Sequence, residues 1–165
     1  MQSNYSISFF LILATLTLVL APNLAARQDW ASLKSLKAVR IVIEDLQPQI
    51  TTQGLVEDSL RVKIELRLRQ AGFTVSGEAN EYLYLNVNTL FVEGIKHFVY
   101  NTKLDFDQNV RLLRTDGFYP AATTWTRSHI GIAPADSVVE EITSSVLGLI
   151  DLFLDDLLAA NPKKN

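Results

Sequence analysis

The side chains of this protein that could take part in catalysis or metal binding are few and scattered. The two histidines, His97 and His129, do not belong to any set of ligand residues at the spacing of a metal site, and the chain has no cysteine. Ser128 precedes His129, but neighbouring residues on a strand point to opposite faces and cannot form a nucleophile–base pair. Motifs for a nucleophile elbow, a phosphate-binding loop or a dinucleotide site do not occur. We therefore predict no catalytic residues, no metal site, no cofactor and no enzymatic activity.

Two pairs of aspartates have spacings that bring carboxylates together. Asp105 and Asp107 would point the same way on a strand, and Asp151 and Asp155 would lie one turn apart on a helix. Paired carboxylates can serve acid–base chemistry or bind calcium. No glycine-containing ligand loop accompanies either pair, so we expect both pairs on solvated faces.

The composition limits the classes to which this protein could belong. The 165 residues amount to one domain, and 48% apolar with 20% charged residues is ordinary for a globular chain. A net charge of -3 argues against a dedicated nucleic-acid-binding protein, because phosphate recognition needs a basic surface. Four basic residues do lie close together, but they alternate with apolar residues and are expected on a solvated face: Arg61, Lys63, Arg67 and Arg69.

The first 26 residues have the layout of a secretory signal peptide. Residues 7–20 are apolar and uncharged, and small residues that suit cleavage end at Ala26. We expect the mature protein, periplasmic or secreted, to have no membrane span and to begin with a lead-in segment at 27–37. An uncleaved anchor stays open as an alternative, because residues 1–6 carry no Lys or Arg.

Residues 55–71 carry two competing patterns. Residues 61–69 alternate between charged and apolar side chains, which favours a strand. Four apolar residues also stand four apart, on one face of a helix: Val56, Leu60, Ile64 and Leu68. Thr51 or Thr52 is placed to cap that helix, and Gly72 is placed to end it. We favour the helix, because most of these residue types are good helix formers.

The rest of the mature chain predicts a sheet and a second helix. Residues 38–46 form a strand, residues 73–75 begin a short strand or link, and three alternating runs form an antiparallel meander: 82–92, 98–112 and 121–132. The second helix starts at Pro134–Asp136 and stops at Asn161–Pro162, with one apolar stripe: Val139, Ile142, Val146, Leu149, Phe153, Leu157 and Ala160.

The order β-α-β-β-β-α predicts an α+β two-layer sandwich. A mainly antiparallel sheet would carry both helices on one face, within a single domain spanning residues 38–162. The other face of the sheet would then be open. If Leu83, Leu85 and Val87 face the core, polar and aromatic side chains gather on that open face.

Tyr, Trp, Arg and Asn on a flat sheet are typical of a recognition surface. The candidate binding residues on the open face are Tyr82, Tyr84, Asn86, Asn101, Arg111, Trp125 and Arg127. The alternative is that Trp125 points into the core and the remaining residues form an ordinary solvated sheet.

Several segments resemble a group of small, uncharacterised exported bacterial proteins. An Ala-Gly-Phe-x-Val segment and a Thr-Thr-Trp strand carry the resemblance, together with flanking residues: 71–75, 108–112, 122–125 and 153–162. At the level of fold, the element order is similar to that of LptE-type envelope assembly proteins. This resemblance implies a non-enzymatic assembly partner, although the chain lacks the lipid-bearing cysteine of such proteins.

These observations predict an exported, non-enzymatic envelope binding or assembly module that uses its open sheet face to contact a protein partner. The alternative is a periplasmic carrier that holds a small apolar ligand between helices and sheet. Nothing in the sequence indicates the oligomeric state.

Overall fold

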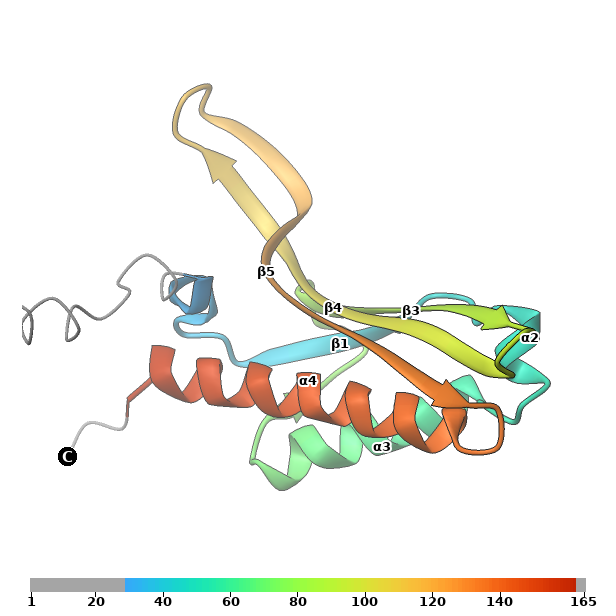
Figure 1. Ribbon diagram of the computed structural model, residues 1–165. Helices are drawn as coiled ribbons and strands as arrows, with labels where there is room; N and C mark the ends of the chain where they lie inside the picture. Colours follow the sequence, from blue (N-terminus) through green and yellow to red (C-terminus); the bar gives the residue numbers. More distant parts are fainter. Residues whose placement is uncertain (1–28, 163–165) are drawn as a thin grey trace, which may run out of the picture.

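A five-stranded mixed sheet with two long helices on one face forms the body of the protein (Figure 1). The computed structural model describes residues 29–162, so the predicted signal peptide lies outside the described residues. The elements follow in the order η2 (Asp29–Leu33), β1 (Ala38–Ile43), α2 (Pro48–Thr51), α3 (Glu57–Gln70), β2 (Thr74–Val75), β3 (Tyr82–Val92), β4 (His97–Leu112), β5 (Gly117–Pro134) and α4 (Val138–Ala160).

The strands lie in the order β2-β1-β3-β4-β5. β1 is parallel to β2 and β3, whereas β3, β4 and β5 form the predicted antiparallel meander. Helices α3 and α4 pack side by side beneath the sheet (Figure 1). The predicted α+β sandwich with both helices on one face is therefore confirmed. Within residues 29–162, no helix is both long enough and apolar enough to cross a bilayer.

Helix α3 forms where two sequence patterns competed. Leu60, Ile64 and Leu68 are buried on one side of it, and this burial favours the helix over a strand. The predicted threonine caps are wrong: Pro48 starts the separate short helix α2, which includes Thr51, and Val56 precedes α3 without a side-chain cap.

The predicted end of α3 is confirmed. Gly72 has φ +79°, a conformation that glycine adopts without steric cost. Its N–H donates to the Arg69 carbonyl at 2.9 Å, and the Phe73 N–H donates to the Leu68 carbonyl at 3.0 Å. These two bonds form a Schellman motif, which directs the chain into the edge strand β2.

The segment before β1 belongs to the core, although its polar sequence does not indicate this. Leu33 in η2 is fully buried, and the Ser32 hydroxyl donates to the Thr124 carbonyl at 3.2 Å. The short helix η2 thus rests against both β5 and α4.

Trp125 connects β5 to α4. It is 1% exposed, pairs with Phe106 in the β4–β5 ladder and packs edge-on against Phe153 at 5.4 Å between ring centroids. Its indole N–H donates to the Asp156 carboxylate at 2.9 Å. The prediction that Trp125 contributes to the open face is wrong, because cross-strand partners share a face and Phe106 faces the helices.

Replacing Trp125 with Phe should destabilise the fold by roughly 1.5–3 kcal/mol, the usual worth of a hydrogen bond to a charged group, in addition to the lost packing. Trp30→Phe is the matched control, since the Trp30 indole nitrogen is buried without a hydrogen-bond partner in the described residues. Urea unfolding followed by circular dichroism measures both. Equal losses in the two variants would contradict the role assigned to the Trp125–Asp156 bond.

Candidate binding surface

The open face is the side of the sheet that points away from α3 and α4. Tyr82, Tyr84 and Asn86 lie on it along β3, and Asn101 lies on it along β4, where it pairs with Asn88. These four residues alternate with the buried residues of their strands, so the structure brings them together as predicted from the pattern.

Three other predicted binding residues lie elsewhere. Trp125 and Arg127 are on the helix side, where the Arg127 guanidinium contacts Asp156 at 2.7 Å and lies over the Trp125 ring. Arg111 lies beyond the body of the sheet, at the end of β4, where it pairs with Asp116 at 2.8 Å. Placing these three residues on the open face was wrong, because β5 faces the core through Trp125 and the β4–β5 hairpin extends past the other strands.

The aspartates of β4 are buried on the open face, contrary to the expectation of a solvated pair. Asp105 is 7% exposed and accepts hydrogen bonds from the Lys103 ammonium at 2.7 Å and the Thr126 hydroxyl at 2.6 Å. Asp107 is 8% exposed and accepts a bond from the Thr123 hydroxyl at 2.6 Å. The partners come from the neighbouring strand as well as β4, so sequence spacing alone does not reveal this burial.

The tyrosines of the open face are held by the same polar network. Burial raises the pKa of Tyr82, and the charge of Asp107 and a hydrogen bond to it add to the shift. The Arg40 guanidinium lies over the Tyr82 ring, 5.2 Å from its centroid. A hydrogen bond to Glu44 is the largest cause that raises the pKa of Tyr84.

The asparagines are also engaged within the sheet. The Asn86 side-chain amide donates to Glu44, and the Asn88 amide donates to the Asn86 carbonyl oxygen. The Asn101 amide donates to the His129 backbone carbonyl at 3.3 Å. The polar half of the open face is therefore an internally bonded surface with fixed side chains.

The other half of the open face is apolar. Leu90 pairs with Val99, Val99 pairs with Ile132, and Ile130 pairs with Asn101, so four apolar residues form a strip across three strands: Leu90, Val99, Ile130 and Ile132. We call these four residues the apolar patch. The exposed fractions are 64% for Leu90, 73% for Ile130 and 58% for Ile132. The sequence analysis did not predict the patch. A sign of it is present in residues 89–92, where the alternation of polar and apolar residues stops.

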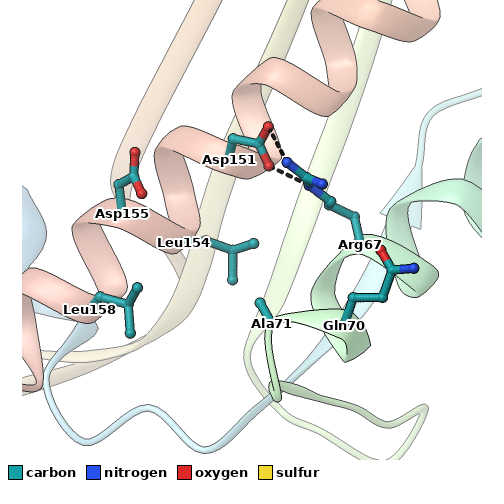
Figure 2. A pocket seen from close by; sticks show the side chains of 7 residues that line it. All are labelled: Arg67, Gln70, Ala71, Asp151, Leu154, Asp155 and Leu158. Carbon is teal, nitrogen blue, oxygen red and sulfur yellow. Dashed lines mark hydrogen bonds and ion pairs between the residues drawn. The ribbon is translucent and has the colours of Figure 1, made fainter. Parts of the chain in front are cut away.

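A groove between α3 and α4 holds the second aspartate pair (Figure 2). It measures about 500 Å³ and is lined by Arg67, Gln70, Ala71, Asp151, Leu154, Asp155 and Leu158. The Arg67 guanidinium makes two bonds to Asp151, at 2.6 and 2.8 Å, and they raise the pKa of Arg67. Within residues 29–162, Asp155 has no hydrogen-bond or ion-pair partner, and no group of three His, Asp or Glu residues could hold a metal ion.

No protein-family model and no curated protein matches the chain. Among solved structures, it is similar to a dodecameric PelC variant from Paraburkholderia phytofirmans, with 15% sequence identity and a TM-score of 0.41. That match covers 73% of this chain and 85% of the other. So distant a likeness carries no argument about function or assembly. The resemblance to small exported bacterial proteins and to LptE-type proteins stays a prediction.

The raised pKa values of Tyr82 and Tyr84 predict that the folded state loses stability above about pH 10. There an unfolded tyrosine releases its proton while the folded one keeps it, so the free energy of unfolding falls as pH rises toward the folded pKa. The double variant Tyr82→Phe/Tyr84→Phe should show a shallower fall. Urea midpoints measured at about pH 8 and about pH 10.5 test this, and equal falls in variant and wild type would contradict it.

Proposed function

We propose that this chain is an exported, non-enzymatic envelope binding or assembly module that contacts a protein partner through its open sheet face. The observation that carries the proposal is the apolar patch. Its members lie side by side on three strands, and a contiguous exposed apolar strip of this kind is typical of an interaction site in a water-soluble domain.

The polar half of the open face supports the same function. Its tyrosines and asparagines are already ordered by Glu44, Asp107 and the backbone, so a partner would meet a surface whose side chains lose little conformational freedom on binding. An apolar centre beside ordered polar groups is the usual composition of a protein interface. The apolar segment at residues 7–20 supports export.

The carrier of a small apolar ligand has less support. The space between helices and sheet is filled by large side chains, of which Phe106, Trp125 and Phe153 are each almost completely buried. A ligand held there would have to displace them. Catalysis also has little support, because Asp105 and Asp107 are bonded to neighbouring side chains.

Photocrosslinking in cells, after fractionation to establish export, tests the proposal. A photoreactive amino acid at the position of Asn101, next to Ile130, should give one dominant protein adduct. The same probe at Leu66, exposed on α3, should not give that adduct. Similar adducts from both positions, or none from Asn101, would contradict the use of the open face.

The double substitution Ile130→Asn/Ile132→Asn should lower the yield of the Asn101 adduct at least tenfold, because about 1.4 kcal/mol of lost apolar burial has that effect. Val62→Asn/Leu66→Asn is the matched control, since it removes two exposed apolar side chains from α3. Melting temperatures of both variants establish that they fold. An adduct that persists in the Ile130→Asn/Ile132→Asn variant would show that the patch is not the docking surface.

A further inference from the structure

The β4–β5 hairpin continues past the sheet as a two-stranded arm, which we define as residues 108–122. It rises from the side of the sheet opposite the helices (Figure 1). Register shifts after Phe106 and Gln108, together with a positive φ of 55° at Ala121, mark the place where it leaves the body. An isolated two-stranded ribbon is marginally stable in water, so a covering surface would stabilise the arm.

The tip of the arm combines exposed apolar side chains with a basic group. Leu113 is 99% exposed and Phe118 is 67% exposed. Arg111 is paired with Asp116, whereas Arg114 has no acidic partner within residues 29–162. The tip therefore presents an apolar side chain immediately beside an unpaired positive charge.

The groove between α3 and α4 has apolar side chains and an acidic group that complement the tip of the arm. Leu154 and Leu158 line it, and Leu158 is 61% exposed. Arg67 is occupied by Asp151, and the Asp155 carboxylate stands apart from that pair (Figure 2).

We propose that the tip of the arm of one copy docks in the α3–α4 groove of a second copy, with Leu113 against Leu158 and Arg114 beside Asp155. Each surface supplies an exposed leucine and an unpaired charge of opposite sign, so docking removes apolar area from water and pairs both charges. This contact goes beyond the proposed function, because it uses neither the apolar patch nor the polar half of the open face.

The geometry of the assembly follows from the positions of the two surfaces. The arm rises on the side of the sheet opposite helices α3 and α4 (Figure 1), and residues of those helices line the groove, so the contact joins two different patches. Where only one arm of a pair is docked, such a head-to-tail contact leaves one arm and one groove free. Unless two copies dock reciprocally and close into a dimer, the contact continues into a ring or an open chain of copies.

Charge reversal tests the contact with the full-length protein recovered from producing cells. Native mass spectrometry and light scattering should show masses above the monomer that grow with concentration. Arg114→Glu alone and Asp155→Arg alone should each weaken association at least tenfold, because each places like charges together. An equimolar mixture of the two variants should restore it, since every arm then meets a groove of opposite charge.

A matched pair of reversals controls for net charge. Lys96→Glu and Asp45→Arg change exposed residues outside the arm and groove, and should leave association unchanged both alone and mixed. The variant Ile130→Asn/Ile132→Asn should also assemble normally, which separates this proposal from that of the open face.

A wild-type protein that stays monomeric, or a mixture that fails to restore association, would overturn the proposal. So would a Leu113→Ser variant that abolishes binding to vesicles of anionic phospholipid while leaving self-association intact. That outcome would make the arm a membrane-contacting element instead.

Discussion

The packing of Trp125 against Phe153 is the contact on which the placement of the other β5 side chains depends. A slip of one residue would move the indole to solvent and remove its hydrogen bond to Asp156, so this register is strongly favoured. Alternation along β5 then sends Ile130 and Ile132 to the open face. The apolar patch exists because a strand that must bury one face against α4 exposes whatever residues lie between the buried ones.

Strands β4 and β5 also form a second exposed surface, the arm, for a different physical reason. Body and arm share β4 and β5, but α4 covers only the body, and the register shifts near Gln108 turn the ribbon away from the other strands. Within residues 29–162, neither α3 nor α4 covers the ribbon beyond that point (Figure 1). Leu113 and Phe118 are exposed for this reason, whereas Phe98 and Leu104, earlier on β4, are buried.

The charged groups divide into those bonded to other side chains of the described residues and those without such a partner. Asp105, Asp107 and Asp151 are each bonded to other side chains of the described part of the chain, so they stabilise local geometry rather than offering free carboxylates. Asp155 and Arg114 differ, because neither has such a partner there. The contrast separates polar groups that hold this fold together from those available to another molecule.

Local patterns in the sequence determined the β1 strand, the meander, the apolar stripe of α4 and the end of α3 at Gly72, because periodicity and glycine conformation act within a few residues. They also determined that Tyr82 and Tyr84 would share the open face. Only the tertiary structure decided that Trp125 faces the core and that Asp105 is buried. Each of those facts depends on a partner from another strand or helix, and no single segment carries that information.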